Sequence, residues 1–349
     1  MKHDILFSLV LVTFSLSAGC AEPDLDESDA AENESAADVD EVVSEAEQAL
    51  TGPTVVAWTA PGGLLQSTGN LYWTANSFSE FGGYYAAVYR AGKGNAPGSE
   101  LILHQESSPN PVTFGDITYA LVGGSWYGYF VSNSGGVSHI KRVPLTGGAA
   151  VVLATSPAEI GGRQTLDTDG TYLYWADAAG VYKMPMGGGA VTTLAGASGV
   201  VSLGLDAANV YYAAGLQIYA VSKSGGFVAA VANATNVQNI NAIFVKPGSP
   251  TELFWAEEGR IVARKPLGGT TNIVQSRNDF WRSTSVSFDG SRVLWTECTT
   301  VNNNNCTAKS KLGQGTPVSV TAGVGANFIQ GDAGSYFFGN LSALYRVGY

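Results

Sequence analysis

Short apolar strands, separated by turns rich in Gly and Asp, recur along residues 54–349. In each repeat one strand carries an aromatic or apolar pair, and successive pairs are 37 to 57 residues apart: Tyr72-Trp73, Tyr129-Phe130, Tyr174-Trp175, Tyr211-Tyr212, Phe254-Trp255, Leu294-Trp295 and Phe337-Phe338. A repeat of about 43 residues built from short strands is typical of a radial propeller, in which each repeat forms one four-stranded blade. The pattern therefore predicts an all-β, seven-bladed β-propeller, with six blades as the alternative.

The repeat at residues 166–196 shows the expected order of elements most clearly. After an inner strand A, the pattern predicts a turn at 167–170, strand B at 172–176, strand C at 181–186 and an outer strand D at 191–194. Aspartates recur at the expected A–B turns, where Asp accepts hydrogen bonds from its own backbone: Asp167, Asp169, Asp206, Asp289 and Asp332. We therefore expect a structural role for them, with a calcium or catalytic site as the alternative.

The last repeat lacks an outer strand. It has strand B at Phe337-Phe338 and strand C at 344–347, after which the sequence ends at Tyr349. Residues 54–58 form an apolar strand that precedes the first repeat and belongs to none. We expect this N-terminal strand to close the ring, because closure removes the exposed sheet edges of an open array.

Two segments, Leu71-Tyr-Trp-Thr74 and Leu173-Tyr-Trp-Ala-Asp177, carry a resemblance to a known family. They are similar to the Tyr-Trp-Thr-Asp propeller repeats of the low-density-lipoprotein-receptor type, and the resemblance extends over about residues 54–349. Such repeats usually make six blades, whereas the pairs indicate seven. The resemblance implies a propeller and a binding role, but no particular ligand, because propellers host many functions.

The N-terminus carries the features of an export signal. Residues 5–18 are mostly apolar but too few to span a bilayer about 30 Å thick as a helix, and they lead into Leu16-Ser-Ala-Gly-Cys20. This segment resembles a bacterial lipoprotein signal, which implies that residues 1–19 are a signal peptide and that Cys20 carries a lipid. A plain secretory signal is the alternative. Ala21 favours the outer membrane, on its periplasmic side or at the cell surface.

Residues 20–50 predict an acidic, disordered tether. Positions 21–50 contain 12 Asp or Glu and no Lys or Arg, which is too polar to bury a core. The formal net charge of -11 therefore belongs to this segment, and residues 51–349, the expected propeller, are close to neutral. Without a basic surface we expect no nucleic-acid partner. We expect a monomer that meets the membrane through its lipid.

Cys298 and Cys306 predict a disulfide. They flank a polar loop between strands B and C of the sixth repeat, and paired strands bring such residues within reach of each other. An exported protein meets an oxidising compartment. A metal site would need further ligands, and the sequence offers none nearby.

No catalytic motif stands out from the repeats. The sequence contains no Gly-x-Ser-x-Gly elbow, no Walker loop and no His-Glu-x-x-His pair, so we assign no catalytic residue, no metal ligand and no cofactor. This favours a binding module for a glycan, peptide or protein. The alternative is a lactonase-like hydrolase or lyase that uses central carboxylates, with or without a metal.

Two irregular segments are the candidates for ligand binding. They are a B–C loop at 76–85 and a D–A connection at 276–282, which are expected on the same face of the ring. Aromatic rings mixed with charged groups suit a glycan or peptide. The alternative is that these rings pack beneath their own loops. The candidate residues are Phe78, Glu80, Phe81, Tyr84, Tyr85, Arg277, Asp279, Phe280, Trp281 and Arg282.

Overall fold

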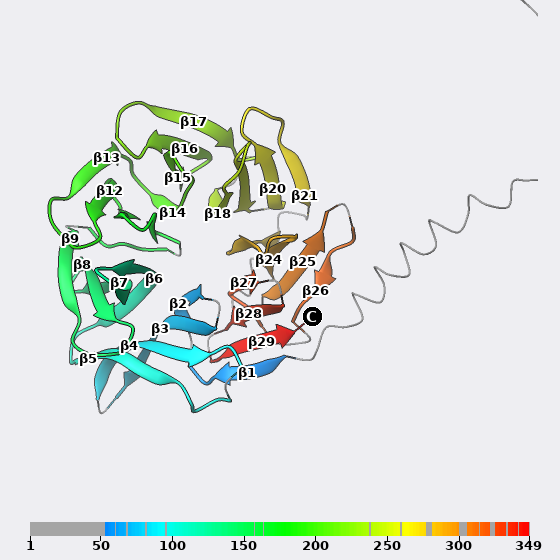
Figure 1. Cartoon of the computed structure of the whole chain (residues 1–349). Helices are drawn as coiled ribbons and strands as arrows, with labels where there is room; N and C mark the ends of the chain where they lie inside the picture. The colour runs from blue at the N-terminus through cyan, green and yellow to red at the C-terminus, as the bar shows by residue number, and fades with distance from the viewer. Residues whose placement is uncertain are drawn as a thin grey trace, which may run out of the picture. The chain divides into compact units, whose positions relative to one another are not determined.

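Seven small antiparallel sheets are arranged as the blades of a β-propeller (Figure 1). The computed structural model describes residues 53–348 apart from 60, 68, 81, 95, 157, 163, 237–238, 259, 277–280, 300–305, 314, 322–324, 333 and 341. The expected signal peptide, Cys20 and the acidic tether lie outside these residues. Within the described part of the chain, no helix has the length and apolar character needed to cross a membrane.

The first four blades each contain four strands in chain order from the centre outward. Their bounds are β2 (Pro61–Gln66), β3 (Asn70–Ser79), β4 (Gly83–Gly92) and β5 (Leu101–Ser108); β6 (Val112–Val122), β7 (Ser125–Ser134), β8 (Val137–Pro144) and β9 (Val151–Ser156); β10 (Leu166–Thr168), β11 (Tyr172–Ala176), β12 (Gly180–Pro185) and β13 (Thr192–Gly196); β14 (Val200–Leu205), β15 (Asn209–Ala214), β16 (Gln217–Ser222) and β17 (Val228–Asn233).

Blade five repeats this order, whereas blades six and seven depart from it. In blade six both β22 and β23 pair with β24, and in blade seven the outer strand is β1. The bounds are β18 (Ile240–Lys246), β19 (Glu252–Glu257), β20 (Arg260–Pro266) and β21 (Asn272–Gln275); β22 (Trp281–Arg282), β23 (Val286–Phe288), β24 (Arg292–Thr299), β25 (Thr307–Leu312) and β26 (Val318–Ser319); β27 (Phe328–Asp332), β28 (Ser335–Gly339), β29 (Leu344–Gly348) and β1 (Thr54–Ala57).

The N-terminal strand closes the ring as predicted. In Figure 1, β1 (blue) lies beside β29 (red), and the two pair antiparallel with Thr54 opposite Arg346 and Ala57 opposite Leu344. Val56 and Ala57 are buried in one cluster with rings of blades one and seven. The ring is therefore closed both by strand pairing between β1 and β29 and by apolar contacts of Val56 and Ala57.

The aromatic pairs pack between blades, as predicted. Tyr129 of blade two and Trp175 of blade three belong to one buried cluster, and the Tyr129 hydroxyl donates to the carbonyl of Met186 at 3.1 Å. Trp255 and Trp295 are likewise buried. Such a ring buries about 150–250 Å², so the repeated aromatics supply much of the apolar contact between blades.

Four of the five recurrent aspartates form the expected turns. Oδ1 of Asp169 accepts hydrogen bonds from the backbone amides of Thr171 and Tyr172, and the same arrangement recurs at Asp206, Asp289 and Asp332. The prediction is wrong for Asp167. This residue belongs to the inner strand β10, because that strand continues two residues further than the turn signal suggested.

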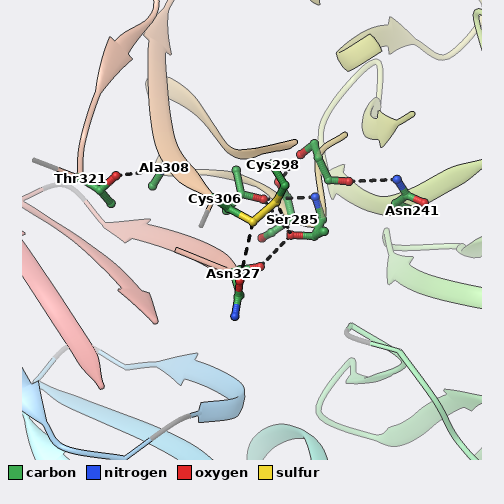
Figure 2. The surroundings of a disulfide bond; sticks show 10 residues. Asn241, Ser285, Cys298, Cys306, Ala308, Thr321 and Asn327 are labelled. Atoms are coloured by element: carbon green, nitrogen blue, oxygen red, sulfur yellow. Dashed lines mark hydrogen bonds between the residues drawn. A yellow bond between two sulfur atoms is a disulfide. The ribbon is translucent and has the colours of Figure 1, made fainter. Parts of the chain in front are cut away.

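The predicted disulfide is present and buried. Cys298 and Cys306 are bonded, with their Cα atoms 4.1 Å apart, and the bond links β24 to the residue that precedes β25 (Figure 2). Around it, Thr284 Oγ1 donates to the carbonyl of Asn327 at 2.8 Å, and Asn241 Nδ2 donates to the carbonyl of Ser283 at 3.1 Å. These contacts join blades five, six and seven.

The segment at 76–85 is not a loop. Residues 76–79 continue β3 and residues 83–85 continue β4, with Asn76 opposite Ala86 and Ser79 opposite Gly83. The hairpin forms because its aromatic and small residues suit a pleated strand better than an irregular loop. The outer strand β5 extends with it, since Tyr84 pairs with Ser108. Blade one is therefore longer than predicted at its B–C end.

Candidate functional site

An aromatic cleft of about 700 Å³ opens between blades one and two, at the ends of the strands that carry the A–B and C–D turns. Its aromatic lining consists of Tyr72, Tyr119, Trp126 and Tyr127. Trp126 is 51% exposed, and its ring centroid lies 5.4 Å from that of Tyr119. Tyr119 in turn lies 6.0 Å from Tyr72. The rings form a continuous wall across the two blades.

A tight turn places Trp126 in this cleft. Strands β6 and β7 are joined through Gly123 and Gly124, whose φ angles are 58° and 81°, and Val122 pairs directly with Ser125. Two consecutive positive φ angles match the twist of a hairpin and strongly favour glycine. Since Trp126 is the second residue of β7, the turn holds it at the end of the blade, beyond the buried part of the sheet.

The charged groups at the cleft are cationic. Arg90 Nη1 donates to the carbonyl of Leu145 at 3.0 Å, across the boundary between the two blades. The guanidinium of Arg142 lies 4.6 Å from the ring centroid of Tyr127. No carboxylate is among the described residues that line the cleft. Burial raises the pKa of Tyr72, so its hydroxyl stays neutral at physiological pH.

The cleft adjoins the mouth of the central channel. This channel mouth is a cavity of about 600 Å³ that shares Ser67 and Tyr119 with the cleft. Its lining combines the polar side chains of Gln66, Gln164, Ser287 and Gln330 with the rings of Phe244 and Phe288. Lys93 and Asp332 form an ion pair at its edge.

Deeper in the channel, two aspartates line a cavity of about 260 Å³. Burial raises the pKa of Asp167 to about 7, and the nearby Asp116 carboxylate adds to the shift, against a hydrogen bond from the Thr168 amide. Asp116 accepts hydrogen bonds from the amides of Ile117 and Leu166, both at 3.0 Å. A carboxyl group that titrates near neutral pH suits acid–base chemistry, although structural burial produces the same shift.

The described part of the chain contains no group of three or more His, Cys, Asp or Glu side chains arranged to hold a metal ion.

The described residues of the first nominated segment lie at the other end of the strands. Phe78 is 61% exposed and contacts Tyr84, with ring centroids 4.9 Å apart, and the Tyr85 hydroxyl donates to Gln105 Oε1 at 2.8 Å. Glu80 is exposed. None of these four lines the cleft, the mouth or the channel.

The second nominated segment is described only in part. Phe81, Arg277, Asp279 and Phe280 lie outside the described residues. The backbone of Trp281–Arg282 forms β22, which pairs with Cys298 and Thr299 rather than forming an open loop.

Sequence reasoning missed the aromatic cleft because it assigned Tyr72 to the packing pair of blade one and considered only loops at the B–C and D–A end. One signal could have indicated the cleft. Trp126-Tyr127 follows the Gly123-Gly124 turn and falls outside the repeated pair Tyr129-Phe130 of the same blade. An aromatic pair that the repeat does not require is a better candidate for binding than one that recurs in every blade.

The seven sheets define the class of this protein as a seven-bladed β-propeller. No protein-family profile matches the sequence, and neither does any curated protein. Among solved structures, it is similar to the extracellular domain of a one-component system from B. thetaiotaomicron, with 12% identity over 82% of this chain and 38% of that chain and a TM-score of 0.59.

Two enzymes also share the architecture. A GH74 enzyme from Niastella koreensis has 13% identity over 85% of this chain and 53% of its own, with a TM-score of 0.61. A puromycin-hydrolysing peptidase from Mycobacterium tuberculosis has 13% identity over 84% of this chain and 54% of its own, with a TM-score of 0.63. The chain thus spans about half or less of these neighbours. At such low identity the likeness shows the fold alone.

Proposed function

We propose that this protein is a lipid-anchored propeller of the bacterial outer membrane that binds a glycan in the aromatic cleft between blades one and two. The observation that carries the proposal is Trp126. It is a large ring left half exposed over a concave cavity, in a fold whose repeated tryptophans at 73, 175, 255 and 295 are buried. A ring that the packing does not use is available for a ligand.

The chemistry of the cleft suits a saccharide. Flat rings from two blades offer apolar area to the face of a sugar ring, while tyrosine hydroxyls and Arg90 offer hydrogen bonds to its hydroxyl groups. The cleft has the size of a small-ligand site, about 300–1,000 Å³, rather than the broad surface of a stable protein interface. Experiment has to distinguish binding of a glycan from binding of a peptide or protein.

A glycan array probed with the purified full chain tests the binding proposal. We expect binding to a restricted set of glycans, which the Trp126→Ala variant should lose by at least about tenfold. The matched control is Trp58→Ala, since Trp58 is 66% exposed and lies away from the cleft, next to β1. Binding that is equal in all three proteins, or absent from the wild type, would overturn the proposal.

The anchoring proposal rests on the segment from Leu16 to Cys20 and on the acidic residues that follow it. Cells supplied with a labelled fatty acid should label the wild-type chain but not the Cys20→Ser variant, which should instead be released in soluble form. Equal labelling of the two would show that Cys20 carries no lipid.

A second candidate function is a hydrolase or lyase that uses the central carboxylates. The observation that favours it is the pair Asp116 and Asp167 in the channel, one of which titrates near pH 7. Incubating the glycans that bind with the wild type and with Asp167→Asn tests it. Cleavage of the glycan by the wild type but not by the variant would establish an enzyme. Intact glycans in both samples would support glycan binding without catalysis.

A further inference from the structure

The aromatic cleft and the channel mouth adjoin and are together called the groove. Tyr119 and Ser67 line both cavities, so the two cavities meet at these side chains. Each cavity alone, about 700 and 600 Å³, lies in the size range that encloses a small ligand. A ligand that fills both is therefore larger than a mono- or disaccharide.

The two halves of the groove share aromatic rings and hydroxyl groups but differ in their other polar groups. The cleft has Asn70 and Arg90, whereas the channel mouth has three glutamine carboxamides and the ion pair of Lys93 and Asp332. Two of these carboxamides have a buried oxygen without a hydrogen-bond partner, at Gln66 and Gln164. An acceptor buried without a donor destabilises the fold, so a ligand that brings hydrogen-bond donors gains affinity by reaching it.

The neighbouring Gln330 is already engaged. Its Nε2 donates to the carbonyl of Leu64 at 2.9 Å, which holds that side chain across the gap between blades seven and one. The ion pair of Lys93 and Asp332 closes the same gap further out. The floor of the mouth is therefore fixed by contacts between these blades, while the buried Gln66 and Gln164 oxygens have no hydrogen-bond partner.

We propose, on the basis of the proposed glycan-binding function, that the ligand is a linear oligosaccharide of at least three units. One end of it stacks on Trp126 and Tyr119, and the chain then extends to the channel mouth, where its hydroxyl groups donate to Gln66 and Gln164. In this arrangement the cleft selects ligands whose sugar rings present an apolar face, and the mouth selects ligands with at least three units.

Defined oligosaccharides test this proposal. Neutral β-1,4-linked oligomers of glucose, N-acetylglucosamine, mannose and xylose, two to six units long, are titrated into the full chain by calorimetry. For the series that binds, affinity should rise about tenfold between two and four units, which corresponds to about 1.4 kcal/mol, and then level off. The Gln66→Leu variant should lose most of this rise, and the Trp126→Ala variant should weaken binding at every length.

The matched control is Gln217→Leu at the start of β16, where the side chain donates to Asn233 Oδ1 at 2.9 Å, away from the groove. It should keep the full dependence on length. Equal melting temperatures of Gln66→Leu and the wild type would show that the variant folds. A dimer that binds as tightly as a hexamer would refute the extended site but leave glycan binding in the cleft intact. Absence of binding in every series would count against both proposals.

Discussion

Blades two and four have the same topology but different amounts of strand. Every strand of blade four has six residues, whereas β6 and β7 of blade two have 11 and 10. In blade two the sheet continues and carries Leu121 and Trp126, which are 50% and 51% exposed.

This difference separates the strand length that the fold requires from the additional strand length of the extended blades. A blade of about six residues per strand suffices to bury its aromatic pair, as Tyr211 and Tyr212 are buried in blade four. The additional length of blades one and two is not needed for closure of the ring. We infer that the regular blades supply mainly stability, whereas the extended blades carry the surface that we propose binds a glycan.

The largest expected effect on stability distinguishes two tryptophans. Trp175 of blade three is 2% exposed within the cluster between blades two and three, and Trp175→Ala should lower the free energy of unfolding by about 3–5 kcal/mol. Trp126→Ala should lower it by less than about 1 kcal/mol because the ring is half exposed. Urea unfolding measures both. Equal losses in the free energy of unfolding would contradict the inference that regular and extended blades have different roles.

The disulfide provides the next test. Blade six departs from the regular pattern by pairing both β22 and β23 with β24, and the bond between Cys298 and Cys306 lies beside this junction. The bond closes a short loop, so Cys298→Ser combined with Cys306→Ser should cost about 2–3 kcal/mol on the chain-entropy model. Thermal unfolding measures the loss, with the chemically reduced wild type as the control. An unchanged melting temperature would show that the hydrogen bonds around the bond suffice.

Acid should weaken the boundary between blades one and two. His104 Nε2 lies 3.0 Å and Lys141 Nζ 2.5 Å from Glu106 Oε1, and these contacts lower the pKa of Glu106 to about 2. A lowered pKa means that the contribution is fully present above about pH 4.5 and is lost as the pH falls toward 2. Glu106→Gln should therefore cost about 1 kcal/mol at pH 7 and nothing at pH 2. A cost independent of pH would exclude the ionic origin.

The opposite pH dependence is expected in blade three. Burial raises the pKa of Asp167 from 3.8 to about 7, so the fold favours the neutral form and loses stability as the pH rises from about 4 to 7. Asp167→Asn mimics the neutral form. Its stability relative to the wild type should improve over that interval, by about 1 kcal/mol, and stay constant above pH 7. Chemical unfolding at pH 4, 6 and 8 measures the trend, and a constant difference would contradict it.

Most of the fold was predictable because it depends on features that recur. An aromatic or apolar pair appears once per blade, and Gly-Gly and Asp turns recur in several blades, so the number of blades and the closing strand could be inferred from the sequence. The Cys298–Cys306 bond could be inferred from the position of the two cysteines at a hairpin. Asp167 was misplaced because a turn signal does not specify the residue at which the preceding strand ends.

The candidate site was predicted poorly because it depends on features that occur once. Whether residues 76–85 form a loop or a longer hairpin depends on pairing with β5, which lies 16 or more residues further along the chain. The wall that Trp126 and Tyr119 build with Tyr72 exists only because blades one and two lie side by side. The local sequence pattern indicates neither the pairing with β5 nor the ring contacts between blades one and two.

The closing strand also has a consequence for the order in which the propeller forms. Thr54 and Arg346 pair from opposite ends of the propeller sequence, so this ladder has the longest chain separation in the fold and should form last. During synthesis from the N-terminus, β1 must wait unpaired until β29 emerges, with Val55 and Val56 open to other strands. Pulse-labelled hydrogen exchange should show β29 protected later than β12. The time before closure, rather than the finished ring, is then when this chain is most prone to aggregate.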